Sequence, residues 1–171
     1  MTTRARIAVL AIAVILLGWT LYEKVYEISA LVVLCIVLVI RAHFKDGTVV
    51  LAAKAFQNKD YQKAEGLLKE IKNPDYLRKA RRGYYEFIYG NLELQRENYA
   101  DAETHFQIAS RFPLGSENDK GLVLVHLANL NLRKKEYIRA QAYVDRAKEL
   151  KISSRVQSII EKIETELRKQ E

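Results

Sequence analysis

Small and apolar residues recur at one fixed spacing through the C-terminal part of the chain. Tyr61, Tyr99 and Tyr137 are equally spaced along the sequence. We call the spacing between two consecutive tyrosines the repeat interval. Each tyrosine is followed three positions later by an alanine: Ala64, Ala102 and Ala140. A register that holds over two repeats predicts stacked helical units that meet through equivalent contacts.

Other columns of the same register are also restricted in residue type. A small residue lies nine positions before each tyrosine, a large apolar one lies five before it, and further small or apolar residues lie seven and ten after it. Intervals of three and four residues predict one buried face per helix, so each unit is a pair of helices meeting just before its tyrosine. The columns are Ala52, Gly90 and Ala128; Phe56, Leu94 and Leu132; Leu68, Phe106 and Val144; and Ile71, Ala109 and Ala147.

Turn and capping residues divide this region into units at about 48–74, 75–113 and 116–152. Asn73 and Pro74 predict a helix start, and Ser116 with Asp119 predicts another after Pro113. A capping box of Ser154 and Gln157 predicts a closing helix at 154–169, because an array needs a polar-backed helix at its open end. Its apolar stripe is Val156, Ile159, Ile160, Ile163 and Leu167.

These columns resemble the tetratricopeptide repeat (TPR) over residues 48 to about 152. The second unit matches the family's pattern most fully, through Gly90, Tyr99, Ala102, Phe106 and Ala109. The family's early tryptophan is absent from every unit, and the repeat interval is longer than the family's usual unit of about 34 residues. The resemblance implies an all-α superhelical array of three helix pairs plus a C-terminal capping helix.

The N-terminal part, residues 1–47, has a different pattern. Residues 7–22 carry no charge, and residues 28–40 contain only Ser29 as a polar residue. Each run is shorter than the roughly 20 residues of a usual membrane span. Trp19 and Tyr22 suit a membrane interface, and Arg41 can extend its charge out of the bilayer. We therefore predict a transmembrane helical hairpin, with helices at about 7–22 and 28–44.

The charges flanking these runs predict the orientation of the hairpin. Arg4 and Arg6 precede the first run, and Arg41 and Lys45 follow the second, which places both termini and the repeat domain in the cytoplasm. Two alternatives stay open. The first run could be a signal peptide, although residues 17–20 make a poor cleavage site. The second run could be a buried or in-plane helix, which would reverse the side of the repeat domain.

A peptide groove is the binding surface that the resemblance implies, on the first helix of each unit. Asn91 and Asn129 occupy equivalent positions there, as do asparagines that bind peptide backbone in the family. The remaining lining is mostly apolar, which favours an apolar peptide or an amphipathic helix as the ligand. The chain's own closing helix or a second copy, as in a homo-oligomer, could instead cover it. The groove residues are Val49, Ala53, Phe56, Tyr84, Phe87, Asn91, Leu122, Val125 and Asn129.

The densest positive charge is a basic patch, beside Tyr84 and Tyr85, that could contact anionic lipid or, less readily, nucleic acid. The alternative is a solvated helix face, since acidic residues elsewhere nearly balance the charge of the domain. The patch consists of Arg78, Lys79, Arg81 and Arg82.

Chemistry-bearing motifs are missing from the sequence. His43, His105 and His126 have no metal-ligand spacing, and the lone Cys35 lies in an apolar run and can form no internal disulfide. No phosphate-binding or nucleophile motif occurs, so we expect no enzyme activity, cofactor or metal.

The sequence favours a membrane-anchored scaffold or adaptor that binds a protein partner at the cytoplasmic face. The alternative is a structural accessory subunit of a larger membrane complex.

Overall fold

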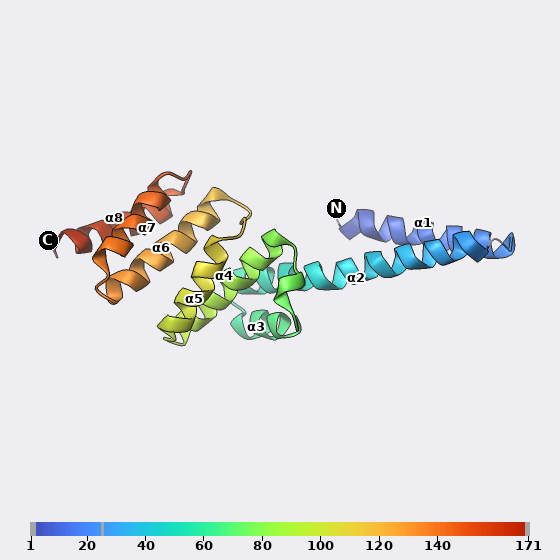
Figure 1. Cartoon of the computed structure of the whole chain (residues 1–171), viewed down its shortest axis with the longest axis horizontal. Helices are drawn as coiled ribbons and strands as arrows, with labels where there is room; N and C mark the ends of the chain where they lie inside the picture. The colour runs from blue at the N-terminus through green and yellow to red at the C-terminus, as the bar shows by residue number, and fades with distance from the viewer. Residues whose placement is uncertain (1–2, 25, 170–171) are drawn as a thin grey trace. The chain divides into compact units, whose positions relative to one another are not determined.

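The computed structural model describes residues 3–24 and 26–169, and these are helical apart from turns and linkers, which confirms the all-α prediction (Figure 1). Contacts divide the chain into two compact units, Met1–Gly47 and Thr48–Glu171. The helices are α1 (Thr3–Tyr22), α2 (Tyr26–Gln57), α3 (Tyr61–Lys69), the short 3-10 helix η1 (Pro74–Tyr76), α4 (Lys79–Gln95), α5 (Tyr99–Ser110), α6 (Glu117–Arg133), α7 (Tyr137–Lys148) and α8 (Ser154–Arg168).

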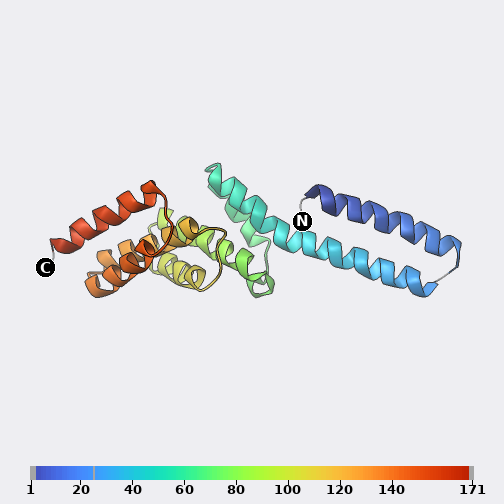
Figure 2. The ribbon, with the colours of Figure 1, turned by 90° about the horizontal axis from the view of Figure 1, so that it is seen from above.

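The unit Met1–Gly47 is a helical hairpin, in which α1 lies antiparallel to the first part of α2 (Figure 2). The Ser29 hydroxyl donates to Thr20 Oγ1 at 2.9 Å, and Thr20 Oγ1 donates to the Leu17 carbonyl at 3.1 Å. Within the described residues, no helix combines the length and apolarity that crossing a membrane requires, so the transmembrane nature of the hairpin is not supported.

Helix α2 differs from the sequence prediction, which placed one helix at 28–44 and started a repeat unit at 48. The structure has a single helix from Tyr26 to Gln57. No proline interrupts this stretch, and an isolated glycine such as Gly47 weakens a helix without ending it. The first helix of the first repeat unit is therefore the end of α2.

In the unit Thr48–Glu171, helices follow one another in a stacked series (Figure 1). Helix α4 packs on α5, α5 on α6, and α6 on α7, while α8 packs on both α6 and α7. The alanine that follows each tyrosine of the register is fully buried, as are Ala52, Leu68, Phe106 and Val144. This arrangement supports a helical repeat-like fold.

The turn inside each repeat unit has the same backbone conformation. Lys59, Glu97 and Lys135, which are separated by the repeat interval, all have a positive φ between 62° and 63°. The next residue donates its N–H to the carbonyl five positions back in every unit, at 2.9 Å. This is the Schellman arrangement, which satisfies carbonyls at a helix end. The repeat therefore extends to the detail of its turns.

Replacing Glu97 by glycine should raise the free energy of unfolding by about 0.5–1 kcal/mol. A left-handed backbone strains every residue with a Cβ, and glycine removes that strain. Gln95→Gly, at the last helical position of α4, is the matched control and should instead lower stability by a similar amount. Urea unfolding of the full chain measures both; equal losses in the two variants would contradict the prediction.

Glycines at equivalent positions let the linkers between units pass close to the following helix. A Cβ on Gly83 would lie 3.0 Å from both the Pro113 carbonyl oxygen and Leu114, and one on Gly121 would lie 2.6 Å from Ile152. The repeat interval separates Gly83 from Gly121, and it also separates Leu114 from Ile152. The register thus sets the path of the linkers as well as the helix faces.

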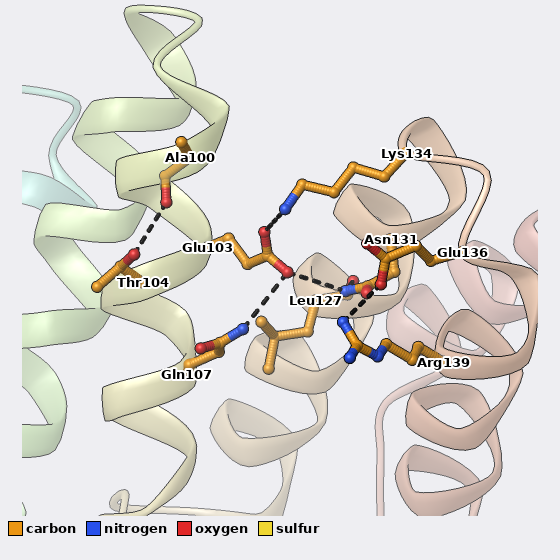
Figure 3. Close-up of polar contacts among 9 residues, drawn as sticks. All are labelled: Ala100, Glu103, Thr104, Gln107, Leu127, Asn131, Lys134, Glu136 and Arg139. Atoms are coloured by element: carbon orange, nitrogen blue, oxygen red, sulfur yellow. Dashed lines mark hydrogen bonds and ion pairs between the residues drawn. The ribbon is translucent and has the colours of Figure 1, made fainter.

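Ion pairs also recur between units. The Arg96 guanidinium binds Glu65, and one repeat interval later the Lys134 ammonium binds Glu103 (Figure 3). The hydrogen bond from Arg96 is the main reason that the pKa of Glu65 is lowered to about 2. The third residue of the carboxylate column is Gln141, which carries no charge. This ion pair therefore links the first unit to the second and the second to the third.

Gly90→Val should lower the free energy of unfolding by about 1–3 kcal/mol, the usual cost of overpacking a core. A Cβ at Gly90 would lie 2.9–3.0 Å from the ring of Phe106, which is fully buried and cannot turn away. Gly66→Val in α3 is the control, because a Cβ there meets nothing within 4 Å. Thermal unfolding of the full chain compares them, and similar midpoints would contradict the prediction.

The predicted helix starts had different outcomes. The Asn73 and Ser116 side chains accept hydrogen bonds from Asp75 N at 3.1 Å and from Asp119 N at 3.1 Å, which confirms both caps. Asn73 begins the short η1 and not the long helix of its unit. The capping box at Ser154 is wrong, because Ser153 is the N-cap and its side chain makes no capping bond. The N–H of Ser153 is bound by Asn118 Oδ1 at 2.9 Å, so α6 holds this linker and sets where α8 begins.

Candidate functional site

The predicted groove residues lie on the end of α2 and on α4 and α6, and they differ in how much surface they expose. Val49 and Val125 have 0% and 3% of their surface exposed, so both belong to the core. Ala53, Phe56 and Leu122 are half-buried and pack against core clusters. Only Asn129 is fully at the surface. The surface that these residues offer to a ligand is therefore smaller than the predicted groove.

Phe87 lies close to aromatic rings from all three repeat units. Its ring centroid lies 6.4 Å from that of Phe56, 6.2 Å from that of Phe106 and 6.5 Å from that of His126. Such tilted and edge-on ring pairs stabilise a core beyond the area they bury. Phe87 is therefore chiefly a packing residue, although part of it stays exposed.

Tyr84 joins α4 to the start of the third unit. Its hydroxyl donates to Asp119 Oδ2 at 2.7 Å and accepts the Gly115 N–H at 3.2 Å. Burial, followed by the hydrogen bond to Asp119, raises the pKa of Tyr84 above its usual value. The polar end of Tyr84 is thus already engaged within the domain, while its ring remains half-buried.

Asn91 and Asn129 lie at equivalent positions of α4 and α6, one repeat interval apart. Asn91 Nδ2 donates to the Phe87 carbonyl of its own helix at 2.7 Å, which orients the amide. An asparagine amide has two N–H donors and a carbonyl acceptor, so further bonds to a peptide backbone stay available to it. These two amides are the polar groups of the candidate groove.

The basic patch is only partly a free surface. Arg82 contacts Glu86 at 2.8 Å and Asp75 at 3.1 Å, and its guanidinium lies 5.7 Å from the Tyr85 ring centroid. Arg82 therefore neutralises charge within the domain. Lys79 is exposed and Arg81 is half-buried, so the predicted lipid-facing charge is reduced.

Glu86 and His105 form an interaction that the sequence analysis missed. Glu86 is only 2% exposed, and its Oε2 lies 2.6 Å from His105 Nδ1. A buried carboxylate needs such partners, because leaving one unpaired costs several kcal/mol. The sequence does contain one indication of a paired Glu86, because Arg82 lies four residues before it on the same helix. His105 lies on α5, so only the fold brings it to them.

Within the described residues, no group of three or more histidine, cysteine, aspartate or glutamate side chains could hold a metal ion. What the surface of α4 and α6 can offer is shape and hydrogen bonding: half-buried apolar side chains beside two amides. No protein-family model, curated protein or solved structure matches this chain.

Proposed function

We propose that the unit Thr48–Glu171 is a tetratricopeptide-like protein-interaction module. The observation that carries this proposal is the recurrence of contacts at the repeat interval: the left-handed turn residues, the linker glycines, and the Glu65–Arg96 and Glu103–Lys134 ion pairs. Units joined by equivalent contacts form a continuous surface, which is how helical arrays bind other proteins.

The proposed binding surface follows α4 and α6. The Asn91 and Asn129 amides would bind the backbone of a partner, and half-buried side chains such as Phe56 and Leu122 would contact its apolar residues. An apolar segment or an amphipathic helix suits this combination. An acidic C-terminus would require positive charge in the groove, and neither amide carries any.

A crosslinking comparison tests this surface. A photoreactive amino acid at Leu122 should capture the same polypeptides in wild type and in a control that changes exposed amides elsewhere, Asn58→Ala with Gln62→Ala. Asn91→Ala with Asn129→Ala should reduce this capture at least tenfold. Both variants should fold alike by circular dichroism. Equal capture in all three proteins would remove the two amides from the proposed function.

We further propose that the unit Met1–Gly47 attaches the module to the cytoplasmic face of a membrane. The large apolar side chains described as exposed there range from 45% to 86% exposed. Apolar surface of this extent is normally covered by lipid or by another protein. The bond between Ser29 and Thr20 supports lipid, because hydroxyls in an apolar medium need partners.

Extraction and labelling test the membrane attachment. The full chain should remain with membranes in alkaline carbonate and be released by detergent. In a Cys35→Ala background, Ser116→Cys should react with an impermeant maleimide only after cells are opened. Release by carbonate would contradict the attachment, and labelling in intact cells would contradict the cytoplasmic side.

A further inference from the structure

A pocket of about 520 Å³ lies between α5, α6 and α7, and none of the proposed groove residues lines it. Three arginines line it: Arg111 at the end of α5, and Arg139 and Arg146 on α7. Gln107, Asn131 and Tyr143 are further lining residues, and none of the described lining side chains is acidic. A concave site with three guanidinium groups and no carboxylate in its lining is suited to an anion.

Most of this positive charge is not neutralised within the domain. In the described part of the chain, Arg111 and Arg146 have no ion pair, while Arg139 contacts Glu136 at 2.7 Å (Figure 3). The buried carboxylate of Glu103 accepts hydrogen bonds from two lining residues, Gln107 and Asn131, whose amide nitrogens lie 3.4 Å from its Oε1. Lys134 already binds Glu103. The positive charges of Arg111 and Arg146 are therefore available to a bound anion.

Helix dipoles do not account for all three arginines. Arg111 and Arg146 lie at helix C-terminal ends, where a cation is favourable. Arg139 lies in the first turn of α7, where a cation opposes the dipole. Its contact with Glu136 offsets part of this unfavourable interaction.

Stacking of the repeat does not require the arginines either. The equivalent positions one repeat interval earlier are Asn73, Asp101 and Ile108. The ion pairs that join neighbouring units recur in both places, Glu65–Arg96 and Glu103–Lys134. The arginines are thus specific to this one pocket, which separates them from the general architecture.

We propose that this pocket binds the phosphate group of a phosphorylated side chain in a partner protein. A phosphate monoester carries close to two negative charges and accepts bidentate hydrogen bonds from guanidinium groups. Two unpaired arginines and a third shared with Glu136 match that charge better than the single charge of a carboxylate. The inference rests on the part of the proposed function that makes this unit a protein-interaction module, and it uses none of the groove residues.

Peptide binding to the full chain tests the proposal. The probes are fluorescent degenerate peptides with a central phosphoserine, serine or glutamate, measured by anisotropy at fixed ionic strength. Wild type should bind the phosphoserine peptides at least tenfold more tightly than the other two sets. Arg111→Gln with Arg146→Gln should lose this preference. Arg155→Gln with Arg168→Gln, on the exposed face of α8, removes the same charge and should keep it.

Several results would overturn the proposal. One is an equal affinity of wild type for the three peptide sets, and another is an equal effect of the pocket and control variants. Vesicles of anionic phospholipid and a single-stranded RNA serve as further probes. If only their binding depends on Arg111 and Arg146, the pocket takes a different ligand. Because Asn91 and Asn129 are unchanged throughout, failure here leaves the groove experiment unaffected.

Discussion

Phe106→Ala should lower the free energy of unfolding by about 3–5 kcal/mol, the usual loss when a buried phenylalanine is truncated. The Phe106 side chain is fully buried, and its ring stacks on His126 with centroids 4.7 Å apart and planes 7° apart. It also lies close to Gly90 and Phe87 of α4. Truncation would therefore open a cavity among α4, α5 and α6, which cannot close without moving the stacked units.

Urea unfolding of the full chain measures this loss, and Ile138→Ala is its control. Ile138 is also a large apolar residue of the repeat domain, but it is 89% exposed, so its truncation should change stability by no more than about 0.5 kcal/mol. A loss below about 1 kcal/mol for Phe106→Ala, well under the usual cost of such a truncation, would show that this ring does not stabilise the contact between units.

The part of the fold that the sequence predicts is the part that repeats. Buried alanines after each tyrosine, and Gly90 beside Phe106, follow from columns that can be compared three times. When the same residue type recurs at equivalent positions of several repeat units, one structural requirement explains all of them. Residues that the fold requires can then be separated from residues that vary freely. Helix α2 has no such support at its centre, and the helix break predicted between residues 44 and 48 is absent, although contacts still divide the chain between Gly47 and Thr48.

The candidate site was less predictable because burial depends on several neighbouring helices at once. Position in the register assigned Val49 and Val125 to the same surface as Asn129, yet the first two are buried and the third is exposed. Pairing across helices has the same limit. Nothing local connects Glu86 with His105, which lies on the following helix.

The arginine pocket illustrates the opposite case, in which departure from the repeat carries the information. Arg139 replaces what is Asp101 one unit earlier, and Arg111 replaces Asn73. On the sequence alone these changes resemble ordinary surface variation. The fold gives them meaning, because it brings both residues to one pocket together with Arg146.

Acidification should destabilise the repeat domain through His126, in addition to any general effect of acid. Burial lowers the pKa of His126 from 6.5 to about 4. The unfolded chain therefore takes up a proton on this ring near pH 6.5, whereas the folded chain resists protonation until about pH 4. The contribution of neutral His126 to stability is fully present above pH 6.5 and is lost as the pH falls toward 4, by at most about 3 kcal/mol.

The comparison of wild type with His126→Phe isolates this effect. Phenylalanine keeps a flat ring against Phe106 but cannot take up a proton, while His105 and all carboxylates stay unchanged. Urea unfolding at several values between pH 4 and 7 should show wild type losing more stability than the variant, with the difference developing below pH 6.5. Parallel profiles would mean that His126 titrates alike in the folded and unfolded states, and that the stack of His126 on Phe106 admits a charged ring.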